Sequence, residues 1–429
     1  MTYLYNKDVN VLNANAIVST TNPLPVTTLG SIYNSSGNLD TAKDAFGRAR
    51  VAEPFTLFDS TFRYGDNSRI WDTALSGSGN TSYSEYESTI NMTVSTASGD
   101  KVVRETKKVF KYQPGKSLLT VNSVVMNQPK ENLRQRIGYF SSRDGHFLEA
   151  NNTTLYIVER SGSAANVVDY AIPQSSWNVD KLDGTGPSGL SVNVANAQIF
   201  WTDTEWLGVG SVRAGFVIDG QFIISHIFHH ANKTTSTYMT TATLPLRLEI
   251  ENTGTTSSNS QLKHICNSIM SEGGFSPTIA TRAISTSLAG KSISDTAYTP
   301  LVALRLKNTH LDSVVIPSLM SAYGLQNTPF RYRLSMDETI TGGSWVSGGT
   351  ESSIEYNITA TSMSGGRVLL EGIFGGGTIG APVNINLRDF DTSFQLRRKL
   401  NGTPETFVLS LIATSNNDDG IGTLTWEEF

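Results

Sequence analysis

The sequence predicts a mainly β protein, and three observations support this fold class. Ile90, Met92 and Val94 alternate with polar residues, which is the period-two pattern of a half-buried strand. Asp219 and Gly220 stand between two apolar runs, which is typical of a two-residue hairpin turn. Charged residues make up only 17% of the chain. Ser, Thr, Asn and Gly, which favour turns and weaken helix interiors, take their place.

The first part of the chain predicts an extended N-terminal arm, residues 1–45. It carries little charge and no sustained apolar period, so it cannot form a core of its own. Asn22, Pro23, Leu24 and Pro25 pre-extend it, because proline fixes φ and disfavours helix before it. We expect this arm to become ordered on a partner, for example by strand addition. A loose terminus is the alternative.

Residues 46–275 predict a central domain of many short strands. Leu119, Val121 and Val125 alternate with polar residues, as do the residues of the 90–94 segment. No alternation of strands with helices interrupts these patterns. The expected architecture is therefore a jelly-roll-like β-sandwich of concanavalin or galectin type.

One segment of the central domain has an ambiguous pattern. Its apolar residues follow helical spacing and predict a short helix: Leu262, Ile265, Cys266, Ile269 and Met270. Strand alternation through Ile265 and Ile269 is the alternative. Cys266 is expected to be buried in either case, as a small apolar side chain without a reactive role.

The last part of the chain predicts a second β-domain behind a linker. Residues 276–297 are rich in Ser, Thr and Ala and are expected to form the linker. Residues 298–429 predict a C-terminal β-sandwich, in which Phe330, Tyr332 and Leu334 alternate with polar residues. Residues 406–411 show the same pattern.

Composition and charge exclude several classes of function. Lys plus Arg is 33 and Asp plus Glu is 38, a net charge of −5 that does not favour nucleic acid as a partner. The densest basic run, residues 101–116, is interpreted as the solvent face of a strand. Cys266 is the single cysteine, so an internal disulfide is impossible. We expect no secretion signal and no membrane span, because no stretch is apolar enough.

His226, His229 and His230 raise the question of a metal site. A zinc protease would carry His-Glu-x-x-His on a helix, whereas Ile227 and Phe228 fill the intervening positions here. Strand alternation would place His226 and Phe228 on one face and His229 on the other. We therefore expect structural histidines, with no metal and no other cofactor.

Residues 201–206 form the best candidate for a carbohydrate site. In a strand, Asp203 and Glu205 would share one face at about 6.5–7 Å, near the separation at which two carboxylates cooperate on a glycosidic bond. The segment resembles the Glu-x-Asp-x-Glu strand of jelly-roll glucanases. Trp201, however, stands where that family has its nucleophile.

No catalytic residue is therefore predicted, and both acids are expected to be structural. Asp203 and Glu205 would hold turns or form ion pairs with arginines such as Arg213. The alternative is glycan contact, in which the two tryptophans stack on sugar rings beside the two acids. The residues of that alternative are Trp201, Asp203, Glu205 and Trp206.

Two stretches carry a family resemblance. The first is residues 44–59, DAFGRARVAEPFTLFD. The second, residues 206–232, begins with WLGVG, contains the Asp219-Gly220 hairpin and ends with HAN. Both resemble a family of virion structural proteins from tailed bacteriophages, of the marine and T4-like type. The likeness runs from about residue 10 to Glu427. It implies an assembly subunit without catalytic or metal-binding motifs, made in the host cytoplasm and carried in the virion.

The expected function is therefore that of a structural component of a phage particle. A tail, baseplate-periphery or fibre position is favoured over a head decoration. Its expected partners are copies of itself, with a trimer as first expectation, and neighbouring virion proteins. A host-glycan-binding adhesin is the alternative, followed by a polysaccharide-degrading enzyme.

Overall fold

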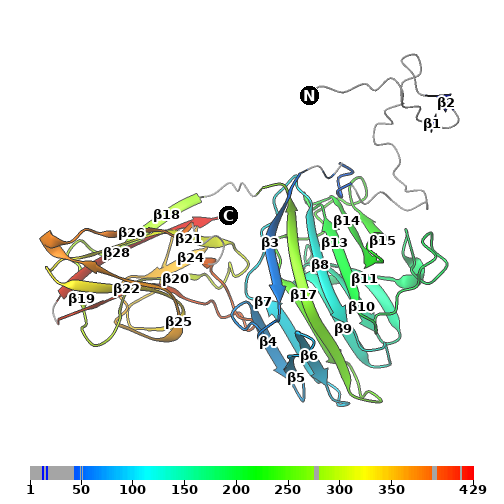
Figure 1. Ribbon diagram of the computed structural model, residues 1–429, viewed down its shortest axis with the longest axis horizontal. Helices are drawn as coiled ribbons and strands as arrows, with labels where there is room; N and C mark the ends of the chain where they lie inside the picture. Colours follow the sequence, from blue (N-terminus) through cyan, green and yellow to red (C-terminus); the bar gives the residue numbers. More distant parts are fainter. Residues whose placement is uncertain are drawn as a thin grey trace.

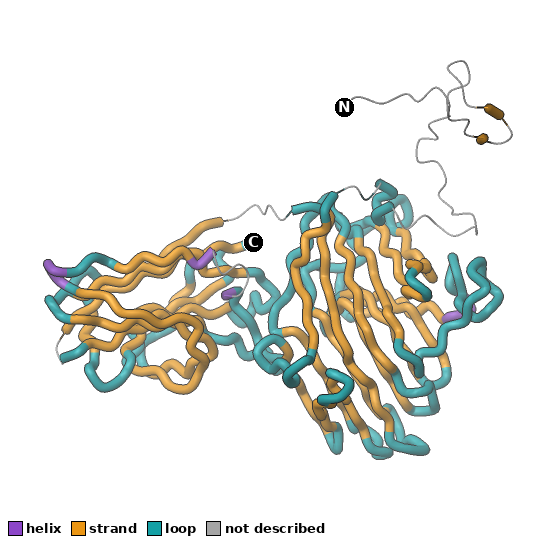
Figure 2. Tube along the Cα trace, in the orientation of Figure 1, coloured by secondary structure: helices purple, strands orange, loops and turns teal. Residues whose placement is uncertain are grey.

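The computed structural model describes residues 12–13, 16–17, 43–48, 50, 52–274, 280–388, 394–415 and 418–429. In these residues the chain forms antiparallel β-sheets that stack as two sandwiches (Figures 1 and 2). The mainly β fold is therefore confirmed. Short turns of 3₁₀ helix lie between strands, among them η1 (Gln174–Ser176) and η2 (Gly377–Ile379). No helix in this part of the chain is long and apolar enough to cross a membrane.

The central domain is a jelly-roll-like sandwich in which strands distant in sequence lie side by side. One sheet has seven strands, in the spatial order β12 (Val168–Pro173), β11 (Thr154–Ser161), β10 (Gly145–Asn151), β9 (Leu133–Phe140), β16 (Leu246–Asn252), β7 (Lys101–Thr106) and β4 (Trp71–Ser76). The other has eight: β15 (Gln221–His229), β14 (Ser211–Ile218), β13 (Gln198–Thr204), β8 (Leu118–Val125), β17 (Ser260–Glu272), β6 (Thr89–Val94) and β5 (Asn80–Ser84), with β3 (Pro54–Thr61) paired to β17.

The inward face of β8 is more polar than its sequence pattern indicates. Leu119 and Val121 lie half-buried on the outer face, whereas Thr120 and Asn122 point inward and are fully buried. Their oxygen atoms are paired across strands, whereas Asn122 Nδ2 has no hydrogen-bond partner in the part of the chain that the structure describes. The Thr120 hydroxyl hydrogen-bonds Thr202 Oγ1 at 2.7 Å, and Asn122 Oδ1 accepts from the Asn267 amide at 2.8 Å. Paired polar groups can therefore occupy core positions without a large desolvation cost.

The predicted hairpin is present. β14 ends at Ile218 and β15 begins at Gln221, so Asp219 and Gly220 form the turn. Their φ angles are 51° and 76°, the left-handed values that a type I′ turn requires.

The C-terminal domain is a second sandwich. Its five-stranded sheet contains β18 (Ala280–Ser285), β28 (Asp418–Glu428), β21 (Val315–Gly324) and β26 (Val383–Asn386), with β19 (Lys291–Ile293) paired to β28. Its six-stranded sheet contains β23 (Val346–Ser347), β24 (Ile354–Asn357), β20 (Thr299–Leu306), β27 (Phe407–Ala413), β22 (Pro329–Thr341) and β25 (Ser362–Gly375). Phe330, Tyr332 and Leu334 face its core, as their alternation predicts.

The linker prediction for residues 276–297 needs correction. β18 and β19 both lie in this segment and pair with β28, the last strand of the chain. β18 is largely exposed on both faces, so its side chains need not be apolar. Backbone pairing, which composition does not report, makes it a strand.

The helix prediction at residues 262–270 is wrong. The segment lies inside the 13-residue strand β17, between β8 and both β6 and β3. The register with β8 shifts between His264 and Cys266, so two half-buried residues follow each other there. Such a bulge breaks strict alternation and produces the apparent helical spacing. Cys266 is half-buried rather than buried, and its thiol donates to Ser123 Oγ at 3.4 Å.

Most of the predicted N-terminal arm, including Asn22, Pro23, Leu24 and Pro25, lies outside the described residues. Within it, β1 (Leu12–Asn13) pairs with β2 (Ala16–Ile17).

Apolar and ionic contacts join the two sandwiches. Val109 of the central domain packs against Val314 and Ile316 of the C-terminal domain. The Gln395 amide donates to the Val109 carbonyl at 2.9 Å. Two ion pairs flank these contacts, Lys107–Glu405 at 2.8 Å and Arg398–Glu105 at 2.7 Å.

The basic run 101–116 is therefore only partly the solvent face predicted for it. Lys107 lies at the domain junction. Arg104 is buried, and it donates to Thr73 Oγ1 at 3.0 Å and to the Asp66 carbonyl at 2.8 Å. Burial lowers the pKa of its guanidinium to about 10, although Asp66 and Asp72 oppose this shift.

Candidate functional site

Strand β13 places Asp203 on the outer face of the eight-stranded sheet, yet its carboxylate is fully buried. It accepts hydrogen bonds from Ser117 Oγ and from the guanidinium of Arg213 on the neighbouring strand β14. Arg50, far away in sequence, adds a third contact at 2.6 Å. The predicted ion pair with Arg213 is therefore present. Two charge-assisted partners compensate a buried carboxylate that would otherwise be very costly.

Glu205 does not share a strand face with Asp203, because β13 ends at Thr204. Its backbone N–H donates to the Ser211 carbonyl at 3.0 Å, and its side chain is half-buried. Burial raises the pKa of Glu205, and the nearby Asp44 and Asp203 carboxylates add to the shift. The two acids thus lie in different environments: Asp203 is buried in ion pairs, and Glu205 is partly exposed to solvent.

The side chains of the two tryptophans in this segment pack against other aromatic residues instead of being fully exposed to solvent. Trp201 is only 2% exposed, and its ring centroid lies 5.5 Å from that of Phe222. Trp206 is half-buried and meets Tyr112 edge to face at 6.0 Å. The Trp206 backbone N–H also donates to the Tyr112 hydroxyl at 3.0 Å. A sugar ring has no access to the face of Trp201, whereas Trp206 keeps a partly exposed surface.

The end of the predicted arm and the residues just after it are fastened to this site. Arg50 bridges Asp203 and Glu272, and Arg213 donates to the Lys43 carbonyl at 2.5 Å. We call Arg50, Asp203 and Arg213 the arm clamp. Asp44 folds the intervening chain into a turn by accepting the Arg48 backbone N–H and side chain, each at 2.8 Å.

The arm clamp brings together the two stretches that carry the family resemblance. Arg50 belongs to residues 44–59, and Arg213 belongs to residues 206–232. The contact could not be found from the sequence, because nothing in either stretch indicates a partner more than 150 positions away. Only Asp203 and Arg213, ten positions apart, could be paired in advance, and they lie opposite each other on the adjacent strands β13 and β14.

The three clustered histidines have three different surroundings. His226 is buried and accepts the Asn178 backbone N–H on Nδ1 at 3.2 Å. Burial lowers its pKa to about 4. His229 is exposed beside Ser211 Oγ at 3.1 Å. Nε2 of His230 lies 3.0 Å from Glu159. The described residues contain no group of three or more potential metal ligands.

Glu159 is a buried acid that the sequence analysis did not single out. Its two oxygens contact Nε2 of His146 at 3.1 Å and Nε2 of His230 at 3.0 Å. Burial opposes the charged state, but the hydrogen bonds from the two histidines outweigh it and lower the pKa of Glu159. The pKa of His230 is raised, because the hydrogen bond and charge of Glu159 outweigh burial. This group holds β10 and β11 to the residue that follows β15.

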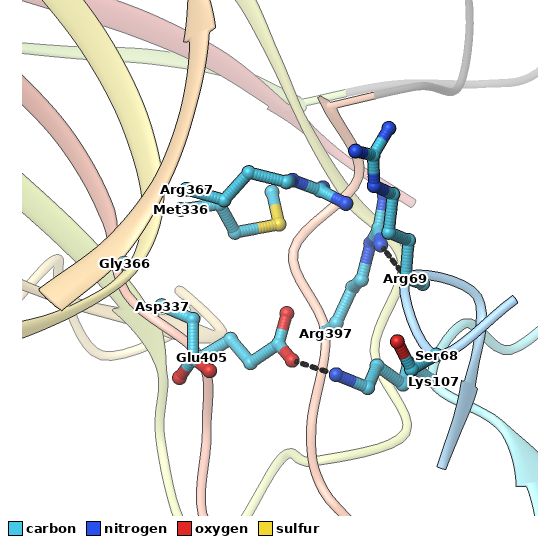
Figure 3. Close-up of a pocket in the computed structure, with 9 residues that line it drawn as sticks. All are labelled: Ser68, Arg69, Lys107, Met336, Asp337, Gly366, Arg367, Arg397 and Glu405. Carbon is cyan, nitrogen blue, oxygen red and sulfur yellow. Dashed lines mark hydrogen bonds and ion pairs between the residues drawn. The ribbon is translucent and has the colours of Figure 1, made fainter.

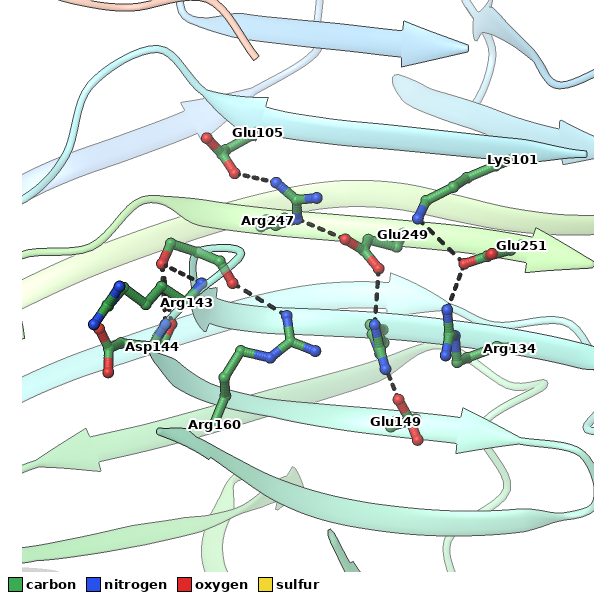
Figure 4. A network of polar contacts seen from close by, with 12 residues as sticks. Lys101, Glu105, Arg134, Arg143, Asp144, Glu149, Arg160, Arg247, Glu249 and Glu251 are labelled. Carbon is green, nitrogen blue, oxygen red and sulfur yellow. Dashed lines mark hydrogen bonds and ion pairs between the residues drawn. The ribbon is translucent and has the colours of Figure 1, made fainter. Parts of the chain in front are cut away.

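The outer face of the seven-stranded sheet carries a ladder of alternating charges (Figure 4). Arg247 binds Glu249 at 2.6 Å and also contacts Glu105. Arg136 lies between Glu249 and Glu149, and Arg134 binds Glu251 at 2.6 Å. Each charge faces an opposite charge on the next strand, so the ladder stabilises strand register. The alternation Arg247, Glu249, Glu251 is the sequence signal for this ladder.

No family model matches the chain, and no curated protein matches it. Among solved structures, the chain is similar to the carbohydrate recognition domain of Emp47p, with 11% identity, coverage of 52% of this chain and 98% of that one, and a TM-score of 0.32. The legume lectin-like domain from Entamoeba histolytica shows 9% identity, coverage of 50% and 97%, and a TM-score of 0.29. The botulinum neurotoxin serotype D binding domain shows 9% identity, coverage of 84% and 97%, and a TM-score of 0.33. Likeness of this extent assigns no function to the chain.

Proposed function

We propose that the chain is a structural subunit of a tailed-bacteriophage virion that acts through protein–protein assembly. The observation that carries this proposal is the arm clamp, which joins the two stretches resembling phage virion proteins. Arg50 and Arg213 share the buried Asp203 carboxylate, so the chain at Arg50, just after the predicted arm, is fastened to the central sandwich. The segment before Lys43 therefore leaves from a defined point, as an arm that docks on a neighbour requires.

The state of the acids supports a role without catalysis. Asp203 is fully buried between two arginines and a serine, so it has no access to a substrate. Glu205 is left without a second free carboxylate beside it in the strand. A glycosidase needs two carboxyl groups that flank the scissile bond. The rest of the proposal follows the resemblance: a homo-oligomer, with a trimer as first expectation, at the tail, baseplate periphery or fibre.

The test is incorporation into phage particles. A chain lacking residues 1–40 should fold into both sandwiches but fail to enter particles in a complementation assay. Arg50→Gln should reduce incorporation in the same assay, because it releases the arm clamp while Arg213 still neutralises Asp203. Arg63→Gln, an exposed arginine of the same domain, is the matched control and should incorporate normally.

Electron microscopy of intact particles should place density for both sandwiches on the tail, baseplate or fibre. The proposal fails if purified particles lack the chain. The docking role of the arm fails if the truncated chain incorporates as well as the full one.

A second candidate function is glycan binding, favoured by the loop that follows β13. Leu207 and Val209 are 51% and 38% exposed there, next to the half-buried Trp206 and Glu205. Exposed apolar residues beside a tryptophan and an acid can provide both stacking and hydrogen bonding for a sugar. A glycan array should then show binding that Trp206→Ala abolishes and Trp345→Ala, in the C-terminal domain, leaves intact. Equal binding by both variants would remove this candidate.

A further inference from the structure

A pocket of about 230 Å³ lies between the two sandwiches, next to the ion pair of Lys107 with Glu405 (Figure 3). The central domain contributes the loop before β4 and the residue after β7. The C-terminal domain contributes β22, β25 and the segment before β27. The lining residues are Ser68, Arg69, Lys107, Met336, Asp337, Gly366, Arg367, Arg397 and Glu405.

Among the lining residues that the structure describes, positive charges outnumber negative ones. Four lining side chains are cationic and two are anionic. Both acids are already engaged by lysines: Glu405 binds Lys107 at 2.8 Å, and Asp337 binds Lys399 at 2.9 Å. Arg69 and Arg367 form no ion pair within the described parts of the chain.

The guanidinium groups converge on one side of the pocket. Figure 3 shows the side chains of Arg367 and Arg397 extending toward Arg69. Arg397 is buried, and its Nη1 donates to the Arg69 carbonyl at 2.6 Å. Burial lowers the pKa of Arg397 to about 10. Glu405 opposes that shift and the positive charge of Arg367 adds to it. Bringing like charges together in a sheltered place is costly unless an anion joins them.

We propose that this pocket binds a small oxyanion, a phosphate or sulfate group, held by Arg69 and Arg367 above the buried Arg397. Guanidinium groups present paired N–H donors that match the oxygens of such an anion. The volume suits one tetrahedral group with water. Arg69 comes from one sandwich and Arg367 from the other, so a bound anion stabilises the junction between them. This inference is independent of the proposed function.

The test is titration of the full-length protein with inorganic phosphate at constant ionic strength, maintained with chloride. Calorimetry should show saturable binding, and the midpoint of thermal unfolding should rise with phosphate. Arg367→Gln should weaken binding at least tenfold, and Arg367→Lys should restore part of it. Arg331→Gln is the matched control, because this arginine lies in the same sheet with a side chain that is 53% exposed. It should bind phosphate like the wild type.

The source of the anion is resolved by a second titration with phenyl phosphate. Binding of both compounds identifies a phosphate group carried on a larger molecule as an acceptable ligand, and binding of inorganic phosphate alone identifies the free ion. If Arg367→Gln does not fold, Arg69→Gln at the exposed edge of the pocket replaces it. The proposal is overturned if phosphate has no effect beyond that of chloride, or if the arginine variants bind it as tightly as the control does.

Discussion

At the scale of single residues, two buried histidines make the protein sensitive to acid. Burial lowers the pKa of His226 to about 4 and that of His264 to about 3, from a usual value of 6.5. Both are neutral in the folded protein, whereas the unfolded chain takes up their protons below pH 6.5. The stability that they contribute is therefore present above pH 6.5 and is lost as the pH falls toward 4. His230 acts differently: its raised pKa adds stability below pH 6.5 that is lost as the pH rises through its folded value.

We predict that protonation of His226 alone removes about 3 kcal/mol from the free energy of unfolding between pH 7 and pH 4, since burial lowers its pKa from 6.5 to about 4. Urea unfolding across that range measures the loss, and His226→Asn should flatten the curve. His310, which is exposed, is the matched control: His310→Asn should keep the wild-type pH dependence. An unchanged curve for His226→Asn would contradict the assignment.

The candidate site was predictable only where its residues are near neighbours in sequence. Asp203 and Arg213 could be paired because they are ten positions apart and lie on the consecutive strands β13 and β14. Arg50 was not predictable, because its contact with Asp203 depends on how the start of the chain crosses the finished sheet. The burial of Trp201 could not be predicted for a related reason. A tryptophan on the outer face of a strand has the same sequence pattern whether other residues cover its ring or leave it exposed to solvent.

At the scale of elements, local chemistry predicted turns and strands well and failed at two places. The Asp219-Gly220 turn carries its own geometric requirement, so the sequence was sufficient. The sequence predicts a helix at residues 262–270 within β17 because a bulge disturbs the alternation there. It predicts a linker where β18 lies because an exposed strand needs no apolar residues. Register shifts, and the pairing of an exposed strand, depend on the partner strands. The sequence of one segment therefore does not predict them.

The same turn provides a test at this scale. Gly220 has a φ of +76°, which a β-branched side chain adopts only with strain. Gly220→Val should therefore lower the free energy of unfolding by about 1–2 kcal/mol. Gly220→Asn, whose side chain tolerates this conformation, is the control and should lose much less. Chemical denaturation of the three proteins decides the point, and equal losses for Val and Asn would show that side-chain bulk matters more than φ.

At the scale of the whole molecule, the ion pairs of the junction couple the two sandwiches. Arg398 binds Glu105 at 2.7 Å and Asp312 at 3.2 Å, so it connects a buried acid of the central domain to the C-terminal domain. Arg398→Ala removes this link, while Arg247 still neutralises Glu105. We predict a loss of about 1.5–3 kcal/mol of coupling between the domains, seen in calorimetry as two separated unfolding transitions. Arg331→Ala, on an exposed face, should leave the wild-type trace unchanged. If the Arg398 variant also gives the wild-type trace, the apolar contacts alone carry the coupling.

The position of β17 in the sheet affects how the chain folds during translation. β17 is the strand to which β3, β6 and β8 are all hydrogen-bonded, yet it is made long after them. At translation rates of about 5–20 residues per second, the roughly 220 residues between Pro54 and Glu272 take about 10–40 s to emerge. During that interval the strand edges that will pair with β17 have unpaired backbone N–H and C=O groups. Such exposed edges are sites where nascent chains can pair with one another. The central sandwich can therefore be completed only after β17 has been made, and the open edges expose the growing chain to aggregation until then.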